Sequence, residues 1–261
     1  MNALKIAATG MSAQQTRVDV ISNNLANMST TGYNTRRAEF ADLHYQQLTR
    51  AGTINAVDGT LIPAGVQLGL GARPTAVSVN VSQGALSATG GDLDVAIEGR
   101  GYIEVTLPSG SSAYTRDGAL KRTGDGLIVT SDGFPVVPNT TIPEDARSIS
   151  INADGEIYAY FADQVEPELL GQLSLAGFTN EKGLEALGGN LFAETNASGP
   201  PAIGNAGTEG LGIFRHGFLE DSSVDPVREI TELIEAQRGY ELNAKVITAA
   251  DQMLSATTQI R

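Results

Sequence analysis

The chain has 261 residues, enough for one large or two ordinary domains, with 17 basic and 30 acidic side chains and a formal net charge of −13. This acidic balance disfavours a general nucleic-acid binder and docking to an anionic membrane, because both surfaces are recognised by positive charge. Cysteine is absent, which excludes disulfide staples, thiol catalysis and thiolate metal sites.

The sequence contains no run of about 18 apolar residues, so we expect no segment to cross a membrane. Near the N-terminus the apolar residues are spaced with a helical period instead of forming one block before a small-residue cleavage site. We therefore expect no cleavable secretory leader.

Residues 1 to about 30 have the pattern of a helix that buries one narrow stripe. Apolar and small residues recur at alternating steps of three and four, which is a heptad seam, and residues 27–32 have the composition of a helix end. A single helix with so weak a seam is marginal in water, so we expect it to become ordered when partners bury the seam. The seam consists of Leu4, Ala7, Met11, Gln14, Val18, Ile21, Leu25 and Met28.

Residues 33 to about 75 have no stable period. Residues 36–45 continue either as a helix or as an extended arm. Residues 44–74 form either short strands or a long loop, because glycines and prolines are scattered through them.

From Val77 the hydrophobic period changes to two. Short alternating runs, such as residues 93–98 and 148–151, are separated by Asp-Gly pairs, which are typical hairpin turns. This spacing predicts an antiparallel sandwich or barrel. Residues 196–210 lack any period and are expected to form a linker or an exposed loop.

A second helix is predicted from Asp225, a suitable N-cap, and Pro226, whose missing N–H costs nothing at the first helical position. It continues to the end of the chain with a second heptad seam. That seam consists of Ile230, Leu233, Gln237, Tyr240, Ala244, Ile247, Asp251 and Leu254.

The predicted fold is therefore α+β, with N- and C-terminal heptad helices that pair as a coiled-coil or tube domain around a central antiparallel β domain. By pattern alone, an intramolecular helix hairpin is as good an interpretation as assembly between chains. The small and polar seam residues and their place at the chain ends favour assembly. The predicted segments are 1–43 (first helix), 44–75 (extended segment), 76–195 (β domain), 196–224 (linker and return) and 225–261 (second helix).

The sequence predicts no active site. Its two histidines, His44 and His216, lie in unrelated segments, and a metal site needs three or four ligands. No G-x-S-x-G elbow is present, and the glycines near residue 70 lack the Lys-Ser/Thr of a phosphate-binding loop. We expect no catalytic, metal-binding or cofactor-binding residues.

Residues 22–43, SNNLANMSTTGYNTRRAEFADL, resemble the N-terminal signature of the bacterial flagellar axial proteins, the family that builds the rod and hook. A match of this length in mixed residue types is highly specific. The signature residues are Asn23, Asn24, Leu25, Ala26, Asn27, Thr31, Gly32, Tyr33, Arg37 and Phe40.

Further motifs extend the resemblance over nearly the whole chain. Residues 94–102 (DVAIEGRGY) are similar to a strand motif of the family, and residues 113–118 (AYTRDG) to its Tyr-Thr-Arg turn. Residues 235–243 (EAQRGYELN) resemble its C-terminal helix motif. There Gly239 replaces the usual alanine, which loosens a helix by about 1 kcal/mol.

The resemblance implies a structural, non-enzymatic subunit that polymerises helically and is exported unfolded, without a cleavable leader. Length and residues 44–74 are most similar to distal rod members, in which a segment at this place packs between protofilaments and stiffens the tube. Such a polymer transmits torque across the periplasm to the outer membrane. The residues assigned to this stiffness segment are Thr53, Asp58, Leu61, Pro63 and Gly65.

The implied partners are other copies of the chain, other rod proteins and the hook protein at the ends of the polymer, the surrounding ring proteins and the flagellar export apparatus. Nucleic acid, direct membrane insertion and cofactors are not implied. Within the family, the alternatives are a proximal rod or hook subunit. From other classes, the alternatives are a periplasmic cell-wall hydrolase with rod-like termini and a secreted adhesin, which the terminal heptads disfavour.

Overall fold

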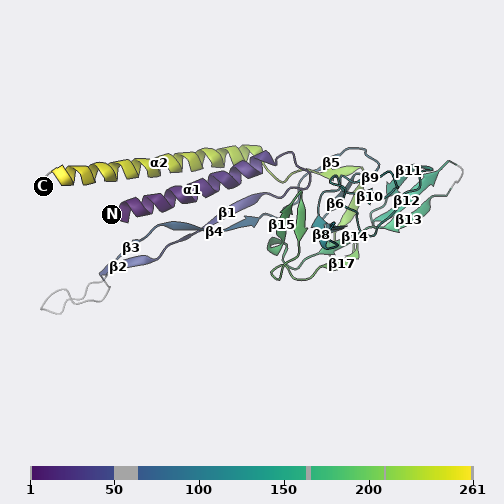
Figure 1. Cartoon of the computed structure of the whole chain (residues 1–261), viewed down its shortest axis with the longest axis horizontal. Coiled ribbons are helices and arrows are strands. Elements are labelled where there is room, and N and C mark those ends of the chain that lie inside the picture. The colour runs from purple at the N-terminus through teal and green to yellow at the C-terminus, as the bar shows by residue number, and fades with distance from the viewer. Residues whose placement is uncertain (1, 50–63, 163–165, 209, 260–261) are drawn as a thin grey trace. The chain divides into compact units, whose positions relative to one another are not determined.

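The chain divides into two compact units, which are described separately. The computed structural model (Figure 1) describes residues 2–49, 64–162, 166–208 and 210–259. Unit 1 comprises residues 1–25, 36–78 and 226–261, and unit 2 comprises residues 26–35 and 79–225.

Unit 1 consists of two long helices and two strand pairs. The helices α1 and α2 lie side by side and antiparallel (Figure 1), with contacts along their length. Strand β1 pairs with β4, and β2 pairs antiparallel with β3. The elements are α1 (Asn2–Ala26), β1 (Arg36–Asp42), β2 (Tyr45–Thr49), β3 (Val66–Gly69), β4 (Ala72–Val79) and α2 (Pro226–Gln259).

The second helix begins at Pro226, as predicted. Residues 36–45, for which a helix and an extended arm stayed open, form β1 and the start of β2, and the described part of 44–74 consists largely of short strands. Gly71 explains how the strands approach α1: its φ is +119°, and a Cβ there would lie 2.0 Å from the hydroxyl of Thr9. Only glycine accommodates this contact.

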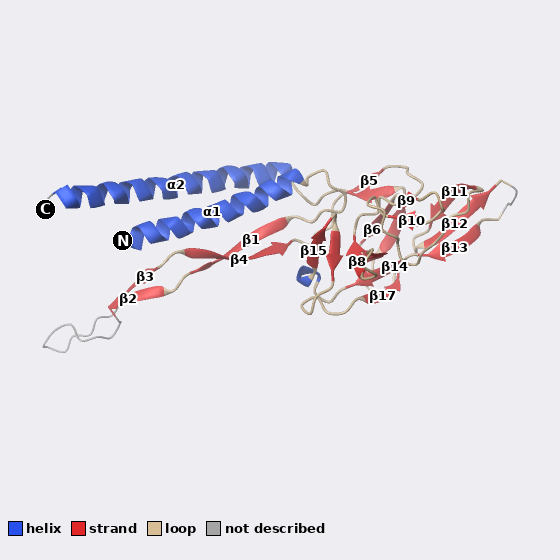
Figure 2. Ribbon diagram, viewed as in Figure 1, coloured by secondary structure: helices blue, strands red, loops and turns tan. Residues whose placement is uncertain are grey.

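Unit 2 is an antiparallel β body built around a six-stranded sheet (Figure 2). The order in this sheet is β15-β16-β8-β7-β14-β17, and a three-stranded sheet has the order β11-β12-β13. The remaining pairs are β18 with β6, β19 with β5, and β10 with β9. The elements are β5 (Leu86–Ala88), β6 (Val95–Glu98), β7 (Tyr102–Thr106), β8 (Ser112–Thr115), β9 (Lys121–Arg122), β10 (Ile128–Val129), β11 (Ala146–Ile151), β12 (Glu156–Phe161), β13 (Glu168–Gln172), β14 (Ser174–Gly177), the 3₁₀ helix η1 (Glu181–Gly183), β15 (Glu185–Gly188), β16 (Leu191–Ala193), β17 (Ala202–Asn205), β18 (Ile213–His216) and β19 (Phe218–Glu220).

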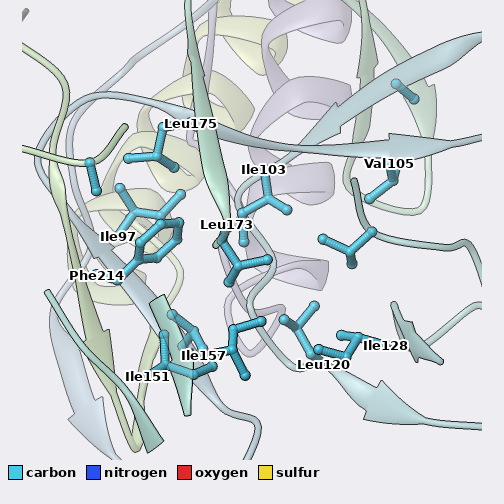
Figure 3. Close-up of a cluster of buried hydrophobic side chains, with 14 of the residues drawn as sticks. Ile97, Ile103, Val105, Leu120, Ile128, Ile151, Ile157, Leu173, Leu175 and Phe214 are labelled. Atoms are coloured by element: carbon cyan, nitrogen blue, oxygen red, sulfur yellow. The ribbon is translucent and has the colours of Figure 1, made fainter. Parts of the chain in front are cut away.

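The core of unit 2 follows from the period-two pattern. Ile103 and Val105 on β7 point into the same interior as Leu173 and Leu175, and all four are fully buried (Figure 3). Because side chains on a strand alternate between faces, one apolar residue in two suffices to fill this interior. The predicted fold class, α+β with helices at both ends and a central antiparallel β region, is confirmed.

The segment 196–224, expected to be a linker and return segment, contributes β17, β18 and β19 to unit 2. Each of these strands has only three or four residues, too few to display a period in the sequence. Their partners come from elsewhere in the chain: Phe214 on β18, for example, lies opposite Ile97 on β6 and is buried. The secondary structure of this segment is therefore determined by pairing with strands remote in sequence and not by its local sequence pattern.

Candidate functional site

Asn24 joins three elements of unit 1 and is 1% exposed. Its Nδ2 donates to the carbonyl oxygen of Arg36 (2.8 Å) and to Oε2 of Glu229 (3.1 Å). Its Oδ1 accepts from the N–H of Arg36 (2.9 Å). A primary amide both donates and accepts, so it pairs with a peptide group as a neighbouring strand does, and has a second N–H for the carboxylate. Asn24 thus holds α1 against β1 and α2.

The second half of the signature is held within unit 2. The N–H of Gly32 donates to the carbonyl oxygen of Glu220 (2.8 Å), and the amide of Asn190 donates to the carbonyl oxygen of Thr31 (2.8 Å). Gly32 has a φ of +66°, and a Cβ there would lie 3.0 Å from the backbone carbon of Arg116. Both the backbone conformation and the lack of space therefore require glycine.

A buried ion pair lies beside Gly32. Nε and Nη2 of Arg116 contact Oε2 of Glu220 at 2.9 and 2.8 Å, with side chains 4% and 3% exposed. The other guanidinium hydrogens go to the carbonyl oxygens of Gly101 (3.2 Å) and Gly99 (3.1 Å). Desolvating such a pair is costly unless further hydrogen bonds satisfy it, and here they do.

Residues from several sequence motifs come together at this ion pair. The signature glycine, the glycines of residues 94–102 and the arginine of the Tyr-Thr-Arg turn all meet at the Arg116–Glu220 pair. Sequence reasoning missed Glu220, which lies in no motif. The one available signal was that an arginine within an apolar strand region requires an acidic partner.

A second charged contact joins the two helices of unit 1. Nη2 of Arg17 lies 3.4 Å from a carboxylate oxygen of Glu232 and 3.6 Å from one of Glu235. Partial burial raises the pKa of Glu232, but hydrogen bonds and charge from Arg228 and Arg17 outweigh it, so the net pKa lies below its ordinary value. The stabilisation this carboxylate contributes is therefore present above its ordinary pKa and is lost as the pH falls through the lowered one.

The predicted seam of α1 lies mostly on its covered side. Ala7 and Ile21 are buried, and Met28 is exposed beyond the end of the helix. The remaining members are half-buried: Leu4, Met11, Gln14, Val18 and Leu25.

The covered stripe of α2 differs from the predicted seam by one residue. Glu229, Ala236 and Ala250 are buried, each immediately before a predicted seam residue. Alanine at positions 236 and 250 lets the helices approach closely, and this close approach outweighs the burial of larger apolar side chains. Among the predicted members, Leu233, Ala244 and Ile247 are half-buried, whereas Ile230, Gln237, Tyr240, Asp251 and Leu254 are exposed. The role of both seams in assembly stays a prediction.

Most large exposed apolar side chains of the described residues belong to unit 1. They occupy α2 and the strands, including the signature residue Phe40. Apolar exposure on this scale marks an interaction surface. These residues are Phe40, Tyr45, Leu48, Val66, Leu68, Leu70, Val77, Val227, Ile230, Ile234, Tyr240, Leu242, Val246, Met253 and Leu254.

Within the assigned stiffness segment, Thr53, Asp58, Leu61 and Pro63 lie outside the described residues. Gly65 immediately precedes β3 and is half-buried.

The two units differ sharply in charge. Unit 1 holds 10 basic and 9 acidic side chains, a formal net charge of +1. Unit 2 holds 7 basic and 21 acidic side chains, a formal net charge of −14. Copies of unit 2 therefore repel one another, whereas copies of unit 1 meet without net repulsion.

The described residues include no group of three or more histidine and acidic side chains placed to hold a metal ion. His44 belongs to unit 1 and His216 to unit 2. Neither helix, over its described length, is long and apolar enough to cross a membrane.

Comparisons with known proteins give matches along the whole chain. Family models match at residues 4–34 (flagella basal body rod protein), 96–159 (flagellar hook protein FlgE/F/G D1 domain) and 215–260 (flagellar basal body rod FlgEFG protein C-terminal). The flagellar basal-body rod protein FlgG of Caulobacter vibrioides is 49% identical, and the alignment covers 100% of both chains. The protein of that name from Agrobacterium fabrum is 47% identical over 99% of both chains. Among solved structures, the flagellar hook protein FlgE2 of Helicobacter pylori matches 71% of this chain and 43% of its own at 15% identity, with a TM-score of 0.25.

Asn24→Asp should destabilise unit 1. The change removes the donor to Arg36 and Glu229 and places a second carboxylate beside Glu229, at a cost of about 1–3 kcal/mol for the unsatisfied groups. Hydrogen exchange of the amides of α1 and α2 measures the loss. Gln15→Glu, the same amide-to-acid change at an exposed site on α1, is the matched control and should change exchange little. Equal protection in the two variants would contradict the role of Asn24.

Gly32→Ala should destabilise unit 2 by more than Gly110→Ala. Both glycines have positive φ (+66° and +84°), but a Cβ at Gly110 meets no atom within 4 Å. Both variants therefore carry the backbone cost of about 1 kcal/mol, and only Gly32→Ala adds a clash with Arg116, worth about 1–3 kcal/mol more. Urea unfolding monitored by near-UV circular dichroism compares them. Equal unfolding free energies would show that the contact with Arg116 is unimportant.

Proposed function

Since the chain belongs to the family of flagellar basal-body rod proteins, we propose that it polymerises into the distal rod of the bacterial flagellar basal body and transmits torque as a stiff shaft. The observation that carries the proposal is the identity of 49% and 47% to relatives named as rod proteins, over essentially the full length of both chains. The function is mechanical, without catalysis or cofactor.

Copies of the chain meet through unit 1. Its apolar residues on α2 and on the strands remain exposed in a single copy, and burying them releases roughly 25 cal/mol per Å² of apolar surface. Its net charge of +1 sets no electrostatic barrier to close packing, whereas the −14 of unit 2 favours spacing between neighbours. These two properties support a polymer in which unit 1 forms the tightly packed part.

The heptad seams act in this packing. On α1 the residues proposed to pack are Leu4, Met11, Val18, Ile21 and Leu25, and Met28 lies just beyond the end of that helix. On α2 they are Ile230, Leu233, Tyr240, Ile247 and Leu254. Ile230, Tyr240 and Leu254 are exposed in one copy and so are accessible to neighbours.

At the ends of the polymer the partners are other rod proteins and the hook protein, and around it the ring proteins. The subunit reaches this place, in the rod that spans the periplasm to the outer membrane, through the flagellar export apparatus. Residues 44–74 stiffen the rod by packing between protofilaments. The exposed apolar residues Tyr45, Leu48 and Val66 on β2 and β3 support such a contact.

The proposal is tested by electron microscopy of basal bodies purified from a strain that lacks the gene. We expect a rod stub without its distal part and without a hook, restored by the unmodified gene. A complete rod that lacks only the hook would assign the chain to the hook instead. Intact motile flagella would contradict the proposal, and a muralytic zymogram of the pure protein would then test for a cell-wall hydrolase.

Ile230→Asp should block incorporation into the rod while unit 2 stays folded. Ile230 is 46% exposed on α2, and burying a carboxylate at a subunit contact costs several kcal/mol. Leu169→Asp is the matched control, because Leu169 is 52% exposed on the acidic unit 2. We expect the control to assemble complete rods. Complete rods from the Ile230 variant, or loss of assembly in both, would contradict assembly through unit 1.

A further inference from the structure

The contacts between α1 and α2 follow one constant register. As the residue number falls along α1, it rises along α2, and the contacts recur at heptad spacing in both helices. The residues in these contacts are polar or glycine, so in addition to the buried apolar residues of α1, such as Ala7 and Ile21, the helices share a polar ladder. Its rungs are Asn24 with Glu229, Arg17 with Glu232 and Glu235, Gln14 with Gly239, and Gly10 with Asn243.

Two rungs are reciprocal contacts of an amide side chain with a glycine. A Cβ on Gly10 would lie 3.0 Å from Nδ2 of Asn243. A Cβ on Gly239 would lie 3.2 Å from Cδ of Gln14. Each amide therefore rests against the bare backbone of the opposite helix. A glycine inside a helix costs about 1 kcal/mol relative to alanine, so each glycine exchanges helix stability for this close contact.

The large apolar residues in the first turns of α2 do not set the register of the two helices. Val227, Ile230 and Ile234 recur at steps of three and four and are all exposed. Inside the pair, Oε1 of Gln14 is buried without a hydrogen-bond partner among the described residues. A polar residue within a helix seam lowers stability but specifies which register is adopted.

We propose that Gln14 and Asn243, each seated on a glycine of the opposite helix, set the axial register of α1 against α2. A shift of one heptad places Gln14 against Glu232 or Val246, and Asn243 against Ala3 or Arg17. Every one of these residues has a side chain where the native register has none, so shifted registers clash. The register decides which residues of α1 lie level with the exposed apolar residues of α2. The inference holds within one copy and does not depend on polymerisation.

The absence of cysteine makes the register measurable by disulfide trapping. A disulfide forms only between residues whose Cα atoms lie within about 7 Å, so each cysteine pair reports one register. Gln14→Cys combined with Gly239→Cys reports the native register. Gln14→Cys combined with Glu232→Cys or with Val246→Cys reports a shift of one heptad. These pairs remove one amide–glycine rung and leave the register to the other, Gly10 with Asn243.

The three cysteine pairs are equilibrated in a thiol redox buffer, and intrachain products are separated from interchain ones on a denaturing gel. We expect the native pair to exceed each shifted pair on the order of tenfold. Adding Gly10→Leu, whose side chain fills the space that the Asn243 amide occupies, should bring this ratio towards one. The double variant Gly10→Asn with Asn243→Gly should restore the ratio. In it the amide side chain and the glycine that it contacts have only exchanged helices. Ser12→Leu, at an exposed site on α1, should leave the ratio unchanged.

A ratio unaffected by Gly10→Leu would overturn the proposal, as would failure of the exchanged pair to restore it. Loss of all three disulfides in the Gly10→Leu variant, with the near-UV circular dichroism of unit 2 intact, would also overturn it. That outcome would mean that the glycine contact holds the helices together without selecting a register.

Discussion

Unit 1 depends on one constraint: the side of α2 that faces α1 consists largely of polar groups, glycine and alanine. It carries Glu229, Ala236, Gly239 and Asn243, so most of the larger apolar residues of α2 are left exposed by the same chain. An ordinary helix hairpin buries its apolar stripe inside the pair. Here the stripe stays outside, and its burial requires another surface. The proposed polymerisation supplies that surface from further copies.

Unit 2 is self-sufficient by comparison. Its strands enclose a contiguous apolar core, and its one deeply buried charge pair, Arg116 with Glu220, is satisfied by hydrogen bonds from all sides among the described residues. It also carries the net negative charge of the chain, −14, against +1 for unit 1. Exposed apolar surface and a high net charge are therefore found on different units of the chain. One unit exposes apolar surface, which the proposed polymerisation would bury, and the other carries the negative charge by which copies repel one another.

Much of this architecture could be predicted from the sequence, because it rests on local pattern. The start of α2 at Pro226, the period-two strands and membership of the rod and hook family are all confirmed. The features that could not be predicted depend on partners remote in sequence. Glu220 lies in no motif, and its importance emerges only when the fold brings it to Arg116.

The stripe of α2 illustrates a different limit. A heptad pattern scored by hydrophobicity selects Ile230 and Tyr240, yet the covered side of α2 carries Glu229 and Gly239, each one position earlier, together with Ala236. Hydrophobicity identifies residues that need burial but not the partner that buries them. Small residues permit the closest approach of two helices, so the intrachain contact follows the small residues and leaves the large ones for other contacts. Both stripes are thus present in the sequence, and the stripe of small residues is the one that contacts α1.

The signature of residues 22–43 owes its specificity to serving both units within one short stretch. Asn24 satisfies a peptide group and a carboxylate in unit 1, and eight residues later Gly32 occupies a position in unit 2 that excludes any side chain. The chain then returns to unit 1 at Arg36, which is itself the partner of Asn24. A segment that contacts only one unit has to satisfy only one set of contacts. A short connection anchored at both ends must satisfy two independent sets of contacts with its length fixed, so few sequences are compatible with it. For this reason the signature was recognisable from the sequence alone, although neither set of contacts was.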